Sequence, residues 1–175
     1  MKTIICKILL WLCLAVILFI FWTGIITVFG YLKIAYAEEI NIEAIIQIES
    51  SGNPFAVSED GCVGLMQLSQ SVIDEFNKRY SKPKLYYKKE ELFDYCNNVK
   101  IGTWYINQRI PEMLKAYHIP DTISTRLIAY NWGIGNLVKF NKKYAGHAVQ
   151  DTLKYLPEET RGYLKKYYKL IKEDK

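Results

Sequence analysis

The sequence predicts a mainly α domain behind an N-terminal hydrophobic helix, and three observations support this. No charged residue occurs over the 25 positions 8–32. The rest of the chain repeats apolar residues at helical spacing, with almost no strand-like alternation. No internal repeat and no linker longer than a loop divides that remainder, so residues 38–175 are expected to form one domain.

The hydrophobic segment is long enough to meet a membrane. At a rise of about 1.5 Å per residue, its helix would be longer than the ~30 Å hydrocarbon core. Lys2 and Lys7 precede it, so the positive-inside rule predicts a cytoplasmic N-terminus and an extracytoplasmic domain. Ala35-Tyr36-Ala37 fits a signal-peptidase site, although the apolar part of a signal peptide usually spans about 7–15 residues. Residues 1–37 are therefore either a transmembrane anchor or a signal peptide.

The charge and the cysteines of the exported part limit its partners. Residues 1–37 contain three lysines and no acidic residue, which leaves 20 basic against 18 acidic residues and argues against nucleic-acid binding. A disulfide between Cys62 and Cys96 is a hypothesis suited to an exported domain. No cysteine pair has metal-site spacing, and His118 and His147 stand far from other ligand types, so we expect no metal or organic cofactor.

Helical periodicity and turn residues define the expected elements. Helices are expected from Asn41 to a stop at residues 50–54, from Ser69, from Asp94 or Asn97, at Pro111, from Thr122 to a loop at 133–135, and from Pro157. Their inward residues are expected to include Val72, Ile73, Phe76 and Tyr80 in the second helix, and Tyr163, Leu164, Tyr167 and Leu170 or Ile171 in the last.

Glu49 continues the apolar face of the first helix. It follows Ile42, Ile45 and Ile46 at intervals of three and four residues, so the four side chains share one side. Burial there would disfavour the charged carboxylate and keep a proton near neutral pH, as acid catalysis requires. The alternative is a solvated carboxylate at a helix end, since Glu is seldom buried unpaired.

Four segments, in order, form a set of motifs. They are residues 49–67 (ESSGNPFAVSEDGCVGLMQ), 98–105 (NVKIGTWY), 129–135 (AYNWGIG) and 157–163 (PEETRGY). Together they resemble the soluble lytic transglycosylase (SLT) family. The resemblance implies a lysozyme-like fold, akin to goose-type lysozyme, with residues 38–175 as the catalytic domain. It also implies cleavage of the bond between N-acetylmuramic acid and N-acetylglucosamine in peptidoglycan.

The resemblance assigns the chemistry to Glu49. A single carboxyl would protonate the leaving oxygen and then take the proton of the muramic C6 hydroxyl, giving a 1,6-anhydro product. The alternative is a muramidase, whose second carboxylate activates water from about 6.5–9.5 Å away. Glu59 and Asp60 are the nearest candidates in sequence, although both suit a turn before Gly61. A catalytically silent glycan-binding module is disfavoured because Glu49 and Gln67 are both present.

Other positions carry implied binding roles. Ser58 and Gln67 match polar residues that help to hold the glycan, Tyr130 matches a tyrosine near the catalytic carboxyl, and Asn131 continues that motif. Each has a structural alternative: Ser58 caps a turn, Gln67 satisfies loop backbone, or Tyr130 is a core ring whose hydroxyl has a partner.

The sequence departs from the family pattern around the expected cleft. Cys62, residues 68–70, Trp132 and Ile134 replace commoner residues, and Trp132 is either a stacking platform for sugar or a core residue. The expected partners are peptidoglycan strands, and the membrane if residues 1–37 are retained. A small one-domain enzyme of this kind also implies service to an envelope-spanning apparatus for secretion, conjugation, pilus assembly or phage entry.

Overall fold

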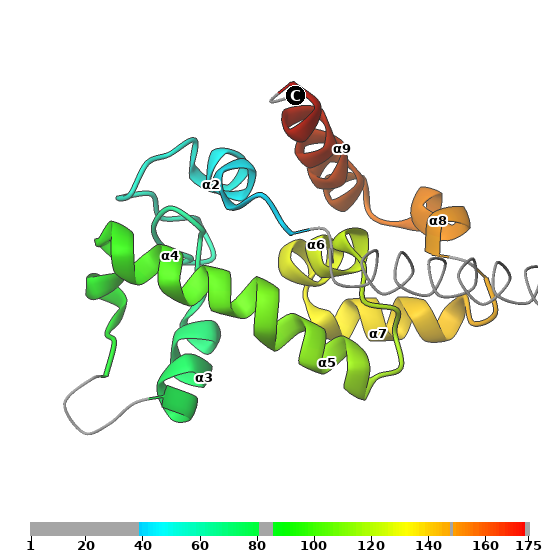
Figure 1. Cartoon of the computed structure of the whole chain (residues 1–175), viewed down its shortest axis with the longest axis horizontal. Helices are drawn as coiled ribbons and strands as arrows, with labels where there is room; N and C mark the ends of the chain where they lie inside the picture. The colour runs from blue at the N-terminus through cyan, green and yellow to red at the C-terminus, as the bar shows by residue number, and fades with distance from the viewer. Residues whose placement is uncertain (1–38, 81–85, 148, 174–175) are drawn as a thin grey trace, which may run out of the picture. The chain divides into compact units, whose positions relative to one another are not determined.

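The computed structural model describes residues 39–80, 86–147 and 149–173 (Figure 1). The hydrophobic segment, expected to be an anchor or a signal peptide, lies outside these residues. Within the described ranges, no helix combines the length and apolar character needed to cross a membrane. Ile40–Lys175 form a compact unit with its own core.

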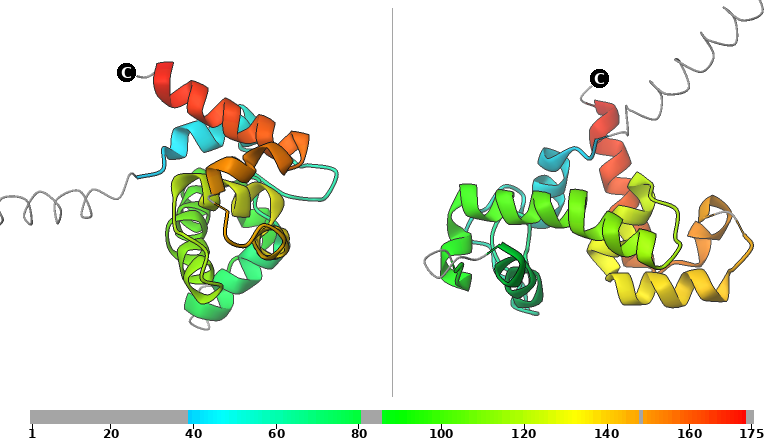
Figure 2. Two further views of the ribbon diagram at one scale, coloured as in Figure 1. Left: turned by 90° about the vertical axis from the view of Figure 1, so that its right-hand side faces the viewer. Right: turned by 60° about the horizontal axis from the view of Figure 1, so that its bottom comes forward.

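Helices make up most of the described chain, which confirms the predicted mainly α class (Figures 1 and 2). The described residues form no β-strand, only isolated bridges from Val63 to Val57 and to Leu68. The helices are α2 (Ile42–Ser50), α3 (Gln70–Tyr80), α4 (Tyr95–Trp104), α5 (Ile110–Ala116), α6 (Ile123–Trp132), α7 (Ile134–Lys143), α8 (Val149–Thr152) and α9 (Glu158–Glu173), with 3-10 helices η1 (Lys89–Phe93) and η3 (Leu153–Tyr155) and a π-helical turn η2 (Tyr105–Arg109).

Helix α2 forms where its apolar stripe predicts. The Asn41 side chain caps it by accepting a hydrogen bond of 2.9 Å from the Ala44 N–H. Ser51 ends it in the left-handed conformation, with φ 53°. Ile45 and Ile46 are buried, at 0% and 6% exposure, and burying such a side chain contributes about 2 kcal/mol. The stripe thus fixes which way Glu49 faces at the end of the helix.

Helices α4 and α5 are joined through η2 into one continuous rod, seen in green in Figure 1. Asp94 begins the rod by accepting a hydrogen bond of 3.0 Å from the Asn97 N–H, so Asp94 rather than Asn97 is the cap. Pro111 lies in the first turn of α5, as predicted. Its ring has no N–H and would crowd the carbonyl four residues earlier in a regular helix, and the wider π turn directly before it relieves that conflict.

The loop predicted at residues 133–135 was wrong in extent, because α7 begins at Ile134. Gly133, with φ 86°, ends α6 and begins α7 by itself, so a single residue makes the turn. Helices α7 and α8 were both missed by the prediction. Gly133 and Gly135 together suggested a loop, but Gly135 already lies in the first turn of α7.

The inward stripes were predicted correctly except at their ends. In α3, Val72, Ile73 and Phe76 are buried, but Tyr80 in the last turn is 45% exposed. Its hydroxyl accepts a hydrogen bond of 3.0 Å from the Trp104 indole N–H, which holds the ring at the surface. In α9, Tyr163, Leu164 and Tyr167 are buried, whereas Leu170 and Ile171 are only half-buried because they lie near the end of the helix.

The hypothetical disulfide between Cys62 and Cys96 is not formed, because both cysteines are free. Cys96 is exposed on α4, two residues before the buried Asn98, whose side chain faces the loop that carries Cys62. Residues two apart on a helix point in nearly opposite directions. Cys96 therefore faces away from Cys62.

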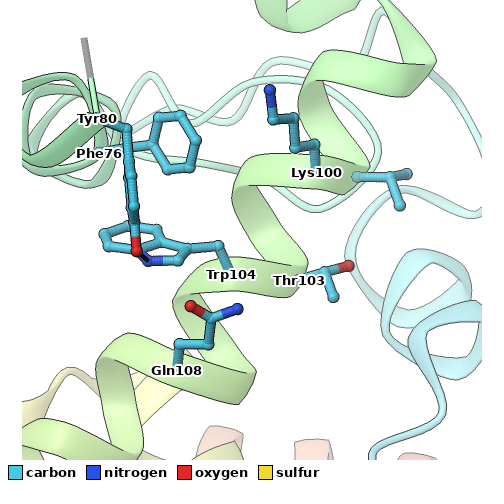
Figure 3. Close-up of a pocket in the computed structure, with 7 residues that line it drawn as sticks. Phe76, Tyr80, Lys100, Thr103, Trp104 and Gln108 are labelled. Carbon is cyan, nitrogen blue, oxygen red and sulfur yellow. Dashed lines mark hydrogen bonds between the residues drawn. The ribbon is translucent and has the colours of Figure 1, made fainter.

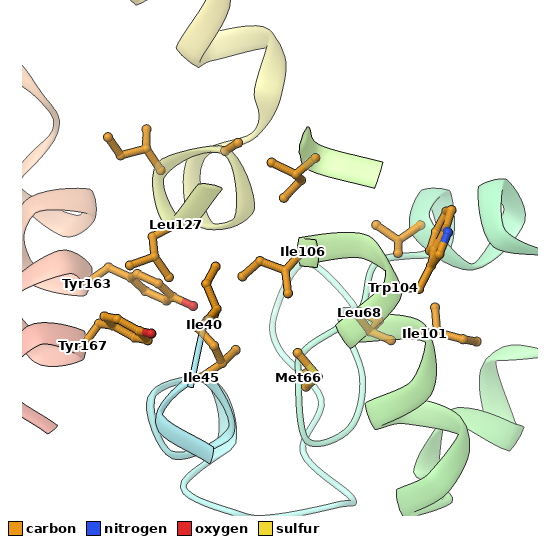
Figure 4. Packing of buried hydrophobic residues seen from close by; sticks show 14 of the residues in the cluster. Ile40, Ile45, Met66, Leu68, Ile101, Trp104, Ile106, Leu127, Tyr163 and Tyr167 are labelled. Atoms are coloured by element: carbon orange, nitrogen blue, oxygen red, sulfur yellow. The ribbon is translucent and has the colours of Figure 1, made fainter. Parts of the chain in front are cut away.

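The core places α9 against α2. Figure 4 shows Tyr163 and Tyr167 projecting from α9 toward Ile40 and Ile45. The Tyr167 hydroxyl accepts a hydrogen bond of 2.9 Å from the Asn41 N–H, at the start of α2. Helix α9 therefore contacts the first residues of α2 through Tyr167, while Tyr163 lies one helical turn away.

Candidate active site at the end of α2

A loop after α2 carries the Gly-Leu-Met-Gln motif, and it is fixed to α4 by one buried amide. The Asn98 side chain is fully buried, and its Nδ2 donates hydrogen bonds to the carbonyl oxygens of Val63 (3.0 Å) and Leu92 (2.8 Å). Its Oδ1 accepts a hydrogen bond of 2.8 Å from the Met66 N–H. Buried backbone groups need such partners, so Asn98 determines the path of the loop.

Two glycines allow the loop and α4 to come this close. A Cβ at Gly64 would lie 2.1 Å from Asn98 Nδ2 and 2.5 Å from the Leu92 carbonyl oxygen, and its φ is 77°. A Cβ at Gly102 would lie 2.3 Å from the Met66 sulfur. The first two sequence motifs are therefore packed directly against each other, and this contact explains why both contain glycine.

Ser58 and Gln67 stabilise the backbone of this loop. The Ser58 Oγ accepts a hydrogen bond of 3.0 Å from the Cys62 N–H. The Gln67 Nε2 donates to the carbonyl oxygens of Ala56 (3.2 Å) and Gly64 (2.9 Å), while its own backbone is left-handed, with φ 45°. These contacts are the ones expected from the structural alternative for each residue.

Tyr130 connects α6 to the same loop. Its hydroxyl donates a hydrogen bond of 2.6 Å to the Met66 carbonyl oxygen. Burial raises the pKa of Tyr130 well above its usual value, and the nearby Glu49 charge raises it further. The phenol therefore stays protonated at neutral pH and ties the loop to α6 close to Glu49.

Glu49 is half-buried at the end of α2 and receives a hydrogen bond of 2.8 Å from the Tyr163 hydroxyl. Burial, the largest influence, raises the pKa of Glu49 from 4.5 to about 7. The Tyr163 hydrogen bond opposes this shift, whereas the negative charge of Glu159 adds to it. A carboxyl group with a pKa near 7 can both give and take a proton at neutral pH.

Glu49 lines a cavity of about 300 Å³ between α2, α6 and α9. Of the predicted site residues, the structure brings Glu49 and Asn131 together in its lining. Ser58, Gln67 and Tyr130 do not line it and instead support the loop beside it. The remaining lining residues are Ile48, Glu159, Gly162, Tyr163 and Lys166.

The carboxylates considered for a water-activating role lie elsewhere. Glu59 and Asp60 are exposed in the turn after Ser58, and neither lines the Glu49 cavity. Glu159, at the start of α9, does line it. The second carboxylate at this site therefore comes from α9 and not from the loop.

A larger cavity of about 640 Å³ lies between α3 and α4 (Figure 3). Its lining includes Phe76, Tyr80, Lys100 and Trp104 but no carboxyl group and none of the predicted site residues. We place the candidate active site at the smaller cavity because that cavity holds the carboxyl with the displaced pKa.

Both histidines lie outside the lining of the Glu49 cavity. His118 is exposed after α5, with φ 55°, and His147 is exposed in the turn after α7. In the ranges that the structure describes, no group of three or more His, Cys, Asp or Glu side chains is arranged to hold a metal ion.

Comparison with known proteins identifies the family. Residues 29–153 match the family described as Transglycosylase SLT domain. The chain belongs to the SLT domain family. This result confirms the resemblance carried by the motifs and is consistent with the lysozyme-like helical fold. The match to the SLT domain ends before α9, so Glu159 and Tyr163 lie outside it.

Curated relatives of this SLT domain have related names. The chain is 36% identical over 116 residues to membrane-bound lytic murein transglycosylase E of Buchnera aphidicola subsp. Acyrthosiphon pisum (strain APS), covering 64% of this chain and 51% of the relative. It is 35% identical over 147 residues to membrane-bound lytic murein transglycosylase C of Serratia proteamaculans (strain 568), covering 74% and 40%. It is 31% identical over 119 residues to endo-type membrane-bound lytic murein transglycosylase A of Cronobacter sakazakii (strain ATCC BAA-894), covering 67% and 59%. The chain thus spans about half the length of these relatives.

Sequence reasoning on this SLT domain missed the contribution of α9. Tyr163 was expected only as a buried residue, although it ends the fourth motif and hydrogen-bonds Glu49. Glu159, in the same motif, and Lys166 were not considered as site residues, although both line the cavity. A tyrosine at a buried helical position needs a partner for its hydroxyl, and that requirement was the available signal.

Proposed function

We propose that this chain is a peptidoglycan lytic transglycosylase that cleaves the β-1,4 bond between N-acetylmuramic acid and N-acetylglucosamine. The observation that carries the proposal is the Glu49 carboxyl, half-buried in a cavity, with a pKa of about 7. Membership of the SLT domain family and the names of the relatives support the same activity.

In the proposed reaction, Glu49 acts first as acid and then as base. Its proton passes to the leaving O4 of N-acetylglucosamine as the bond from that oxygen to muramic C1 breaks. The muramic C6 oxygen then bonds to C1, and its proton returns to the Glu49 carboxylate. No water is consumed and Glu49 ends in its starting state, so one carboxyl with a pKa near neutrality suffices.

The neighbouring residues have supporting roles in this proposal. Tyr163 orients the Glu49 carboxyl and favours its ionised form once the proton has left. Asn131, which lines the same cavity from α6, offers an amide to the sugar. Ser58 and Gln67 bind the glycan only through atoms that their loop contacts leave available, so their principal effect is on loop shape.

Hydrolysis is the second candidate, because Glu159 shares the cavity with Glu49. A muramidase would need that carboxylate to activate water. The two reactions differ in their products, since an anhydro-muropeptide is lighter than a hydrolysed one by one water.

The test is digestion of purified sacculi by the full chain in detergent, with products analysed by mass spectrometry. The wild type should release anhydro products, Glu49→Gln should release none, and Glu159→Gln should still release anhydro products. Glu59→Gln, a change in the exposed turn, is the matched control and should behave as wild type. Reducing-end products that disappear with Glu159→Gln would establish the muramidase instead.

The proposed place of action is outside the cytoplasm, with residues 1–37 as anchor or signal and residues 38–175 as the catalytic domain. The absence of charge over residues 8–32 and the membrane-bound relatives support this. Cell fractionation that finds the full chain in the cytosol would refute it. The proposed role in a secretion, conjugation or pilus-assembly apparatus rests on resemblance alone. A deletion strain in which all three functions are intact would refute that role.

A further inference from the structure

The larger cavity, between α3 and α4, has the composition of a ligand site although it lies apart from Glu49. Its volume of about 640 Å³ falls within the range of about 300–1,000 Å³ that is usual for sites of small molecules. Such sites combine apolar and aromatic walls with a few polar groups. Three aromatic and three polar side chains meet that description here: Phe76, Tyr80 and Trp104, and Lys100, Thr103 and Gln108.

The aromatic rings of the α3–α4 cavity are held in fixed positions, as Figure 3 shows. The Tyr80 and Trp104 rings lie 5.7 Å apart at an interplanar angle of 88°, and the indole N–H donates a hydrogen bond of 3.0 Å to the Tyr80 hydroxyl. Trp104 also meets Phe76 edge-on, with the ring centroids 5.0 Å apart. Tyr80 is nevertheless 45% exposed. It therefore presents a flat apolar surface to solvent, and a ligand that stacks on it would restrict little further side-chain motion.

Polar groups with unused hydrogen-bonding capacity lie beside these rings. Gln108 is exposed and Thr103 is half-buried, and neither side chain hydrogen-bonds to any residue that the structure describes. The amide and the hydroxyl each offer both a donor and an acceptor. Lys100 donates a hydrogen bond of 3.0 Å to the Tyr87 hydroxyl and has further N–H donors. The described lining includes no carboxyl group, so the cavity can bind polar ligands but lacks the acid that glycoside cleavage requires.

The α3–α4 cavity lies on the side of α4 that faces away from the motif loop beside Glu49. Asn98 and Gly102 face that loop. Lys100 and Trp104 each follow one of them by two residues, and residues two apart on a helix point in nearly opposite directions. The two cavities share no lining residue among those that the structure describes. A sugar bound at Glu49 therefore leaves the α3–α4 cavity open.

We propose that the α3–α4 cavity is a second glycan site, which binds N-acetylated sugars of peptidoglycan without cleaving them. The proposal rests on the proposed function for the identity of the polymer. A pyranose ring has an apolar face of C–H groups and a rim of hydroxyl and acetamido groups. Tyr80 stacks on the apolar face, and Thr103 and Gln108 hydrogen-bond the polar rim.

The polar groups of the cavity favour a sugar over an apolar protein segment. Such a segment would cover the Thr103 hydroxyl and the Gln108 amide without giving them partners, which costs free energy. A sugar satisfies both groups while it covers the Tyr80 ring. With this second site, the enzyme stays attached to the wall after the strand at Glu49 has been cut.

The test uses a probe that carries no peptide, the β-1,4-linked tetramer of N-acetylglucosamine. It is titrated into the full chain carrying Glu49→Gln in detergent, and the indole N–H signal of Trp104 is followed by NMR and assigned with Trp104→Phe. This N–H is bonded to the Tyr80 hydroxyl, so a sugar on the Tyr80 ring should shift its signal in a saturable way. Gln108→Ala should raise the midpoint of the titration about threefold, and Tyr80→Leu about fivefold.

Tyr117→Leu is the matched control. Tyr117 has a similar exposure of 52%, follows α5 and does not line the cavity, so the midpoint should stay as in the parent. Gln108 is exposed and its side chain has no hydrogen bond within the described structure, so its variant keeps the test decisive if Tyr80→Leu fails to fold.

Two results would overturn the second site. One is tetramer binding, measured by calorimetry, that saturates without moving the Trp104 signal. The other is a shift whose midpoint Gln108→Ala leaves unchanged, because the signal would then report binding at the Glu49 cavity. A wild-type chain that releases no product from sacculi, while the Trp104 signal and both variants behave as expected, would refute the proposed activity and leave the second site standing.

Discussion

Replacing Glu49 by Gln tests how strongly the site disfavours a charged carboxyl. Glutamine keeps the shape of the side chain and can still accept the hydrogen bond of the Tyr163 hydroxyl. Burial raises the pKa of Glu49 from 4.5 to about 7, so the folded protein holds a proton that the unfolded chain has released between these pH values. The contribution of Glu49 to stability is therefore complete below pH 4.5 and lost as the pH rises through 7.

The size of the effect follows from the two pKa values. A change from 4.5 to about 7 corresponds to ~3 kcal/mol of folding free energy, an upper limit because Glu49 is only half-buried. At about 3 °C per kcal/mol for a domain of this size, Glu49→Gln should raise Tm by up to about 10 °C at pH 8. At pH 4 the difference should nearly vanish, since the carboxyl is then mostly neutral in both states.

Thermal unfolding of the full chain, followed by circular dichroism at pH 4 and pH 8, makes the comparison. Other groups also titrate in this range, so the informative quantity is the difference between the variant and the wild type. Glu59→Gln, in an exposed turn, should show little difference at either pH. An equal Tm difference for Glu49→Gln at both pH values would show that the carboxyl has an ordinary pKa and would refute the argument for its role as acid.

Four further substitutions follow from the geometry, one of them a control. Gly64→Ala should lower the free energy of unfolding, measured by urea titration, by about 3 kcal/mol or more, because the backbone at Gly64 has a positive φ and the added Cβ would overlap the buried Asn98 amide. Gly135→Ala is the control: there is open space around Gly135, so this change should be neutral or slightly stabilising. Tyr163→Phe removes the hydrogen bond that lowers the pKa of Glu49, so the upper limb of the pH profile of activity should move to higher pH. Glu159→Gln removes a charge that raises the same pKa, so that limb should move to lower pH; shifts in the same direction for both variants would contradict this account.

Local signals predicted the helices near the site well. The apolar stripe of α2, the Asp94 cap and Pro111 in a first turn each depend on a few neighbouring residues, and all three are confirmed. Helix α7 was missed because Gly133 alone makes the turn from α6, and sequence gives no measure of how short a turn will be. Local chemistry thus predicted helices that begin with a capping side chain or a proline, and it missed α7, which begins directly after a one-residue turn.

The site itself was predicted only in part, because its contacts join distant segments. Glu49 was singled out by its position on the stripe, but its partner Tyr163 is 114 residues away. The loop contact of Gln67 depends on a left-handed backbone that a glutamine rarely adopts. Such contacts depend on packing that periodicity and turn chemistry do not encode.

The packing of α9 on α2 has a consequence during synthesis. Helix α9 is made after every other described element, yet it supplies the Tyr163 hydroxyl, a wall of the Glu49 cavity and part of the burial around it. Until α9 has left the ribosome and docked, Glu49 is a carboxyl open to water with an ordinary affinity for protons. In a nascent chain Glu49 would thus be ionised at neutral pH, and it could act as an acid only after α9 has docked.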